Sequence, residues 1–384
     1  MPETIAKRKV LLIADAHLHL IWPLPRLFHQ AGAHLVLLAP QTQLFRHSRF
    51  VDEWIDLQPG FQETLGGRIA TQLAAHRDAL VVFTSQPLLD VFFAEAHPAL
   101  TPNGLNAELW RALADKSAFQ AWATARHLPV PPGRLCATMD EAVAWVEQHG
   151  VAMLKSDGVH GGMGVRKVTD ADEARAAWQV LPTTAGIIVQ NYIEGDIGCT
   201  ELVLQHGRPV AWFASTKERS VTHFGASIVR RLVHPPGMDE LVQAVSAASG
   251  FHGLCGFDWI QDNDGKLWLL EFHPRTPSGF GWGRYAGVDV PAAVRTLLED
   301  RPGPTRAPLP AEQLARAPLC CYFPAHFWWA LTQQPRDLKY WLPGSNAVSW
   351  RNVPLDDPRL LAGVLVFALR QLFRRHCPRW FSTP

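Results

Sequence analysis

Residues 251–275 constrain the fold more than any other stretch, because they have the pattern of a β-hairpin. We expect one strand over 254–261 and a second over 266–273, joined by a turn at 262–265 with the sequence Asp-Asn-Asp-Gly. Asn and Asp before Gly favour a tight turn, since these residues tolerate a positive φ. Side chains alternate along a strand. We therefore expect two faces on the second strand, the first with Leu267, Leu269 and Glu271, the other with Trp268, Leu270 and Phe272.

Three side chains of this hairpin are of types that bind metal ions. Asp258 lies 13 positions before Glu271, which puts the two carboxylates roughly opposite each other, and His273 follows on the face of Glu271. Carboxylates crowded into a half-buried site need a compensating cation. Oxygen-rich ligation favours Mg²⁺ or Mn²⁺. For an isolated turn of this kind, a surface hairpin with solvent-facing acids is the commoner outcome, but the glycine-rich stretch at 154–165 weakens that alternative.

Composition excludes several classes of partner. The chain has 384 residues, enough for two or three domains. Its 36 Lys and Arg nearly balance 35 Asp and Glu, so nothing argues for general affinity for nucleic acids. No apolar run reaches membrane-spanning length. The six cysteines form no C-x-x-C pair and no signal peptide is evident, so we expect reduced thiols and a cytoplasmic protein.

The first part of the chain alternates between strand and helix patterns. Buried strands are predicted at 9–14, 34–39 and 79–84, and helices at 21–31 and 86–96. Such alternation with short turns predicts a small, doubly wound α/β domain over residues 1–105.

A D-x-H-x-H sequence, Asp15-Ala16-His17-Leu18-His19, follows the first strand. It resembles the metal-binding start of the amidohydrolase barrel. That barrel needs eight βα units with further ligands on later strands, and the later chain does not repeat in this way. We therefore interpret the two histidines as turn residues.

The next segment, 106–300, ends with the hairpin. Apolar spacing predicts a single helix over 106–128, with Asp115-Lys116 in its middle, and another over 139–149. A strand then ends at Lys155, and a glycine-rich loop leads into a strand that begins at Val165. Glycines let backbone N–H groups crowd around phosphate oxygens, and a lysine adds positive charge. The P-loop and dinucleotide fingerprints are absent, which leaves a lid over phosphates or a mobile loop.

Residues 301–384 differ in composition from what precedes them. A stretch rich in Pro and Ala over 301–318 predicts a linker, and an aromatic-rich C-terminal extension follows. Its aromatic residues suggest a packed layer or a pocket. A final helix over 360–375 has a basic end with Arg370, Arg374 and Arg375. It could dock on the core, dimerise or rest on an anionic membrane surface, and we favour core or dimer.

Four spaced motifs together resemble the ATP-grasp superfamily, in particular its D-alanine–D-alanine ligase and biotin carboxylase branches. The motifs are Asp115-Lys116, Lys155 with Gly161-Gly162-x-Gly164-Val165, the connector Gln190-Asn191-Tyr192-Ile193-Glu194-Gly195, and Asp258 with Glu271-Phe272-His273-Pro274-Arg275. Their order and spacing match over about residues 100–295. The resemblance implies an α/β fold in which an α+β ATP-grasp domain at 106–300, with a lid subdomain at about 130–190, follows the first domain.

The resemblance also implies a role for each matching residue. The residues expected to contact ATP are Lys116, Lys155, Gly161, Gly162, Gly164, Gln190, Tyr192, Ile193 and Glu201. The expected ligands of magnesium or manganese are Asp258, Glu271 and His273. Arg275 is expected to contact the acyl phosphate or the substrate carboxylate. Arg230, with Lys217 or Arg219, is expected to contact the transferred phosphoryl group.

Two positions depart from the family pattern. His273 stands where the family has Asn, and imidazole is a softer ligand that titrates near neutrality. Ile197 stands where the family often has the acid that contacts the ribose, so that contact is unassigned.

The implied reaction is ADP-forming ligation of a small carboxylate to an amine, or to a thiol, through an acyl phosphate. Such catalysis is mostly positioning and charge neutralisation. The implied partners are small-molecule carboxylate and amine substrates, and a homodimer is the assembly considered. Two alternatives remain: a carboxylase or purine-pathway enzyme of the same superfamily, and a nucleotide-binding regulatory or tailoring protein without turnover.

Overall fold

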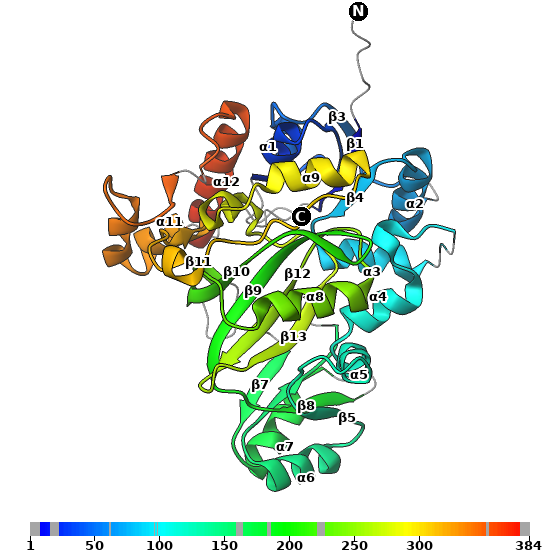
Figure 1. Ribbon diagram of the computed structural model, residues 1–384, viewed down its shortest axis with the longest axis vertical. Helices are drawn as coiled ribbons and strands as arrows, with labels where there is room; N and C mark the ends of the chain where they lie inside the picture. Colours follow the sequence, from blue (N-terminus) through cyan, green and yellow to red (C-terminus); the bar gives the residue numbers. More distant parts are fainter. Residues whose placement is uncertain are drawn as a thin grey trace, which may run out of the picture.

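The structure is a computed structural model that describes residues 8–15, 23–60, 63–95, 97, 99–158, 164–182, 186–220, 227–350 and 353–376. Three sheets follow one another along the long axis of the molecule (Figure 1). The first sheet has the strand order β3-β2-β1-β4, the central sheet β13-β12-β9-β10-β11-β14, and the third sheet β5-β8-β6-β7.

The first sheet is parallel, and its two inner strands are buried on both faces. Its strands are β1 (Lys9–Ile13), β2 (His34–Ala39), β3 (Glu53–Asp56) and β4 (Leu80–Phe83). Alternate residues of β1 pack in opposite directions, Val10 and Leu12 into one core cluster and Leu11 and Ile13 into another. Helix α1 (Pro23–Gln30) belongs to the first cluster, and helices α2 (Leu65–Ala75) and α3 (Gln86–Ala94) belong to the second. This is the doubly wound α/β arrangement that the sequence predicts.

The helix predicted over 106–128 is two helices, so that prediction is wrong. Helix α4 (Ala107–Ala114) ends and helix α5 (Lys116–Ala125) begins at Asp115, whose backbone is extended (φ −85°, ψ 132°). Asp competes poorly inside helices and favours their ends. The break makes Lys116 the first residue of α5.

The third sheet is antiparallel and has its own core. It consists of β5 (Gly133–Cys136), β6 (Ala152–Lys155), β7 (Val165–Val168) and β8 (Ile187–Asn191). Helices α6 (Met139–His149) and α7 (Ala171–Val180) pack on it, and the buried residues of this cluster all fall between Cys136 and Val189.

The central sheet is antiparallel and carries the hairpin. Its strands are β9 (Gly195–Gln205), β10 (Arg208–Ser220), β11 (Ser227–Val233), β12 (Gly253–Asp262), β13 (Leu267–His273) and β14 (Cys320–Cys321). Helix α8 (Met238–Ser249) covers one face, where Met238 and Val242 pack with Leu202 and Trp212 (Figure 1). The other face receives helix α9 (Val290–Glu299) and also holds the polar residues described below.

A β-bulge corrects the predicted faces of β13. Trp259 pairs with Leu269 but Asp258 pairs with Glu271, so Leu270 is an extra residue in β13. One extra residue inverts the alternation of side chains beyond it. Phe272 therefore joins Leu267 and Leu269 in the core, and Glu271 does not share their face as predicted.

Residues 301–318, predicted to be a linker, lie against the central sheet. The N–H of Arg306 donates to the carbonyl of Val210 (2.8 Å), and the N–H of Trp212 donates to the carbonyl of Arg306 (3.1 Å). Beyond β14, Trp341 packs against Phe323, Phe327 and Trp350, which is the predicted aromatic layer. The remaining elements are η1 (Leu44–His47), η2 (Pro102–Gly104), η3 (Phe280–Ala286), α10 (Ala311–Leu314), α11 (Ala325–Thr332), η4 (Pro335–Trp341) and α12 (Pro358–His376).

Among the helices that the structure describes, none combines the length and the apolar character needed to cross a bilayer.

Candidate functional site

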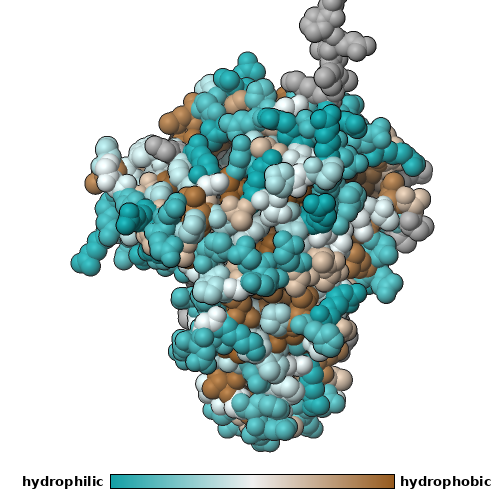
Figure 2. All heavy atoms as spheres, viewed as in Figure 1, coloured by the Kyte–Doolittle hydropathy of each residue, from teal (hydrophilic) through white to brown (hydrophobic). Residues whose placement is uncertain are grey.

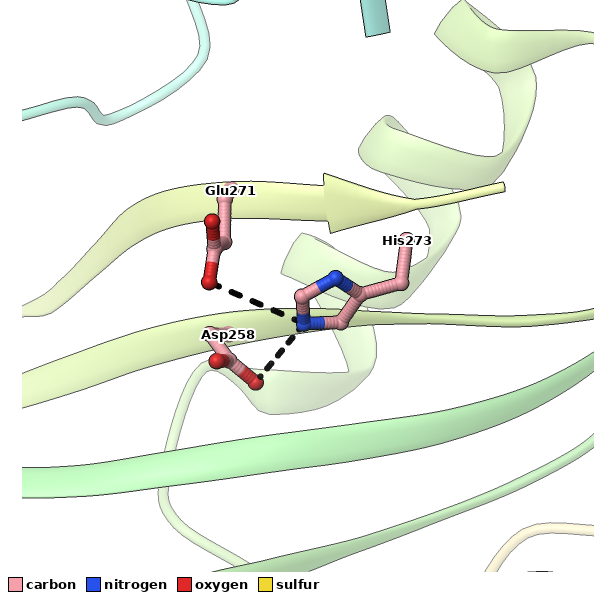
Figure 3. A group of neighbouring side chains, drawn as sticks. All are labelled: Asp258, Glu271 and His273. Atoms are coloured by element: carbon pink, nitrogen blue, oxygen red, sulfur yellow. Dashed lines mark ion pairs between the residues drawn. The ribbon is translucent and has the colours of Figure 1, made fainter. Parts of the chain in front are cut away.

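Asp258, Glu271 and His273 converge at one point on paired strands, as the hairpin pattern predicts. Asp258 lies on β12 directly opposite Glu271 on β13, and His273 follows two residues later (Figure 3). Nε2 of His273 is 3.3 Å from Oδ1 of Asp258 and 3.9 Å from Oε1 of Glu271. One donor atom from each residue lies within 4.8 Å of the other two, close enough for a single cation to contact all three.

The electrostatics of this trio suit a cation. Burial alone would raise the pKa of Asp258, but His273, Arg230 and Cys199 together outweigh burial and hold that pKa below its usual range. Burial alone would lower the pKa of His273, but Asp258 and Glu271 raise it above 6.5. Two carboxylates and one imidazole are donors that Mn²⁺ and Mg²⁺ accept. The side chain of Glu271 is 44% exposed, so a cation can enter from solvent.

Cationic side chains occupy the same face of the central sheet. Strand register places Cys199 opposite Asp258 and Ser215 opposite Cys199, and Lys217 lies opposite Arg230. Because paired residues share a face, these side chains form a row that starts at the trio and runs across the sheet. Burial lowers the pKa of Lys217, an effect that Asp258 partly offsets.

Arg230 and Glu201 are buried and incompletely paired. Burial opposes the charge of Arg230, but Tyr322, Cys199 and Glu201 raise its pKa. Its Nη1 donates to Ser215 Oγ (3.3 Å), while its Nε has no hydrogen-bond partner in the described part of the chain. Glu201 is 1% exposed, its Oε2 is also unpartnered among the described residues, and burial raises its pKa to about 7.

Arg275 lies where the first and central sheets meet. It follows β13, and the next residue, Thr276, donates its N–H to the carbonyl of Phe83 at the carboxyl end of β4 (3.0 Å). Burial lowers the pKa of Arg275, and Glu271 and Asp258 counter this. Ligands of α/β sheets bind at the carboxyl ends of the parallel strands. Arg219, the alternative to Lys217, is paired with Asp337 (3.0 Å).

Two lysines approach from the third sheet and α5. Lys155 ends β6, and burial lowers its pKa to about 8, with Lys116 adding to the effect and Glu271 and Asp258 opposing it. Nζ of Lys116 donates to the carbonyl of Ser156, the residue after Lys155 (3.0 Å). The break in the predicted long helix thus directs Lys116 toward the end of β6.

The remaining residues predicted to contact ATP lie in several parts of the structure. Gly164 is buried and its carbonyl accepts from the N–H of Ser156 (2.9 Å), but Gly161 and Gly162 lie outside the described residues, as do His17 and His19. The Gln190 side chain is 4% exposed and donates to Gln120 (2.5 Å), so it faces α5. The N–H of Tyr192 donates to the carbonyl of Val151 (3.0 Å). Ile193 is half-buried in the connector.

Three residues of the site were not predicted. Cys199 and Ser215 belong to the site because β9 pairs with β12 and β10 in this register. Local sequence patterns do not reveal that pairing. Tyr322 follows β14, is buried and exchanges a hydrogen bond with Ser278 (2.7 Å). A two-residue strand such as β14 gives no periodic signal.

Comparisons with known proteins agree with this architecture. No family model matches the chain. A D-alanine–D-alanine ligase of Stutzerimonas stutzeri (strain A1501) is 26% identical over 194 residues, which is 45% of this chain and only 60% of that relative.

Solved structures match over a larger share. The biotin carboxylase domain of Hydrogenobacter thermophilus 2-oxoglutarate carboxylase, solved with MgADP, ADP and bicarbonate, has a TM-score of 0.60 at 17% identity, covering 78% of this chain and 72% of that one. An L-amino acid ligase from Bacillus licheniformis has a TM-score of 0.57 at 18% identity, and the match covers 80% of this chain and 76% of that one. An N5-carboxyaminoimidazole synthetase from Staphylococcus aureus, solved with ADP, has a TM-score of 0.57 at 13% identity. The match covers 78% of this chain and 80% of that one.

At these identities the matches establish the fold alone. This chain has the fold of these solved structures, which is the fold that the resemblance to the ATP-grasp superfamily implies.

Proposed function

We propose that the protein is an ATP-dependent, ADP-forming ligase that joins a carboxylate to an amine, or to a thiol. One observation carries the proposal: the trio Asp258, Glu271 and His273 lies on the face of the central sheet that also carries Lys217 and Arg230. Lys155, from the third sheet, is close enough to Glu271 and Asp258 for both carboxylates to raise its pKa. Opposite charges gathered from two sheets suit a metal–triphosphate complex.

The residues divide the work of such a reaction. Asp258, Glu271 and His273 would hold Mg²⁺ or Mn²⁺, which neutralises phosphate charge when bound. Lys116 and Lys155 would bind phosphate oxygens beside the backbone of the glycine-rich loop. Contacts to adenine and ribose would come from the connector and Glu201.

The arginines and Lys217 would position the reacting carboxylate. A carboxylate oxygen forms a bond to the γ-phosphorus while the bond to ADP breaks. The amine nitrogen then attacks the acyl carbon, phosphate leaves, and the nitrogen loses one proton. Arg275, Arg230 and Lys217 would balance the charge on the acyl phosphate. No protein nucleophile is required.

The relatives' names favour amino acids as substrates. A D-alanine–D-alanine ligase and an L-amino acid ligase are among the matches, so we infer a small amino acid or carboxylic acid as the carboxylate. None of the five cysteines that the structure describes forms a disulfide, which fits a reducing, cytoplasmic setting.

The test is ADP and phosphate release from ATP with Mg²⁺ or Mn²⁺, against amino acids and small carboxylic acids offered singly and in pairs. A ligase needs two substrates for release, and mass spectrometry of the product names both. Glu271→Gln removes a charged metal donor and is expected to reduce turnover at least 100-fold with the melting temperature unchanged, a loss of about 3 kcal/mol in transition-state stabilisation. Asp264→Asn, in the exposed turn of the same hairpin, is the matched control. Full activity in Glu271→Gln would contradict the metal assignment.

A second candidate, nucleotide binding without turnover, is favoured by His273. The 3.3 Å contact with His273 already compensates the charge of Asp258 without a metal. ATP that raises the melting temperature while no pair of substrates, bicarbonate included, releases ADP would support this candidate over a ligase or a carboxylase.

A further inference from the structure

Helix α12 docks on the body of the protein through one side of its described part, residues 358–367 and 369. Leu360 is 1% exposed and Val364 is fully buried, both within the core cluster of the first sheet. Gly363 lies close to Leu44 of η1, where an added Cβ would meet the leucine side chain at 3.4 Å. Core packing therefore accounts for this side of the helix.

The outer side of α12 is apolar and exposed. Leu365 is 49% exposed, Val366 48% and Leu369 52%, and Leu355, just before the helix, is 62% exposed. Residues three and four positions apart on a helix lie next to each other, so Leu369 lies beside both Val366 and Leu365. Figure 2 shows brown, hydrophobic spheres at the upper left of the molecule, where Figure 1 places α12. Contiguous exposed apolar side chains mark an interaction surface.

The charge of this segment has one sign. Residues 358–376 contain Arg359, Arg370, Arg374 and Arg375 and no Asp or Glu, and the sequence continues with Arg379-Trp380-Phe381. Exposed aliphatic side chains together with arginines and aromatic residues are the composition of helices that lie in the membrane interface. Such helices gain attraction from anionic headgroups.

We propose that α12 docks the protein on an anionic lipid surface, with Leu365, Val366 and Leu369 entering the headgroup region. A second copy is the less suitable occupant, because a symmetric dimer sets the same surface against itself. The two acids just before the helix cannot neutralise a second set of arginines. Asp356 is paired with Arg26 (3.0 Å), and buried Asp357 accepts from Ser48 and from the N–H of Arg49. Anionic lipid supplies the negative charge that this surface lacks.

The test is flotation of the full chain with vesicles of phosphatidylcholine, with and without phosphatidylserine. Binding is expected only to vesicles that contain phosphatidylserine, and it should weaken as salt is raised. The double variant Leu365→Glu, Leu369→Glu should lose binding. The double variant Arg374→Gln, Arg375→Gln should bind more weakly by about fivefold per arginine.

Matched controls change exposed residues elsewhere on the protein. Val180→Glu replaces a 66% exposed valine at the end of α7, and the double variant Arg77→Gln, Arg208→Gln removes two exposed arginines. Both should bind like the unaltered protein, and melting temperatures establish that all variants fold. Equal binding to both kinds of vesicle, or none to either, overturns the proposal. Sedimentation equilibrium that instead reveals a dimer broken by Leu365→Glu, Leu369→Glu overturns it in favour of a second copy.

Discussion

Nε2 of His273 lies 3.3 Å from Oδ1 of Asp258, although the strand register pairs His273 with Gly256. The imidazole reaches diagonally across the hairpin to a carboxylate two residues further along β12. The contact stabilises the proton on His273 and the negative charge on Asp258, since it raises one pKa and lowers the other. A metal that uses His273 as a ligand must first displace that proton.

Metal affinity should therefore rise with pH. Asp258 and Glu271 raise the pKa of His273 above its usual range, so the imidazole holds its proton to higher pH, and metal binding releases that proton. The apparent affinity for Mn²⁺ should increase about tenfold per pH unit until the pH passes the pKa of His273, and then level off. Titrations followed by electron paramagnetic resonance between pH 6 and 9 measure this.

The variant His273→Asn tests whether His273 causes the pH dependence. The amide does not titrate, so the affinity of this variant for Mn²⁺ should not change with pH. His234→Asn is the matched control, since His234 makes a similar contact with Asp239 (2.7 Å) on other elements. An unchanged slope in His273→Asn would assign the released proton to another group.

The sequence predicts this trio because two local rules suffice. A turn of the Asp-Gly type fixes the partner strand, and the period of two places His273 with Glu271. The bulge at Leu270 is beyond such rules, since it depends on Trp259 and Leu269 packing into a core assembled from distant segments. Without the bulge, Asp258 would face Leu270 and Glu271 would face Phe257.

Other parts of the site depend on contacts between remote segments. Cys199 meets Asp258 only after β9 pairs with β12, and Tyr322 directly follows a strand of only two residues. The turn at Asp115 was missed because apolar spacing continues across it, although a single extended residue is enough to redirect Lys116.

Nucleotide binding should take up a proton at alkaline pH. Burial and the neighbouring Lys116 lower the pKa of Lys155 to about 8, so at pH 9 it is mostly neutral. A bound triphosphate favours the ammonium form and returns the proton. Calorimetry at pH 9 in buffers of different ionisation enthalpy should report uptake of about 0.9 proton per ATP.

Lys155→Arg should bind ATP without this uptake, because the guanidinium stays charged at pH 9. Lys167→Arg, an exposed lysine on β7, should leave the uptake intact. Uptake that survives in Lys155→Arg would locate the proton elsewhere.

Gly198→Ala should destabilise the central sheet. A Cβ at Gly198 would lie 2.1 Å from Cζ2 of Trp259, which is fully buried and donates its indole N–H to Thr200 Oγ1 (3.0 Å). Overpacking of this kind costs roughly 1–3 kcal/mol, measurable as a lower midpoint of urea unfolding. Gly60→Ala, where the nearest atom would be 3.6 Å away, should change stability by less than about 0.5 kcal/mol. Equal effects in the two variants would mean that the sheet yields around Trp259.

Glu201 should make the protein less stable as pH rises from 4.5 to 7. Burial raises its pKa from 4.5 to about 7. In that window the folded state keeps a proton that the unfolded state has lost, so this group's contribution falls with rising pH by at most about 3 kcal/mol and stays low above pH 7. Glu201→Gln removes the titration while keeping the shape of the side chain. Its melting temperature should match the unaltered protein near pH 4.5 and exceed it by a margin that grows up to pH 7. Glu147→Gln, on the exposed side of α6, should show no such margin. A constant difference at every pH would mean that Arg230 keeps Glu201 ionised throughout, and that the buried pair is a salt bridge.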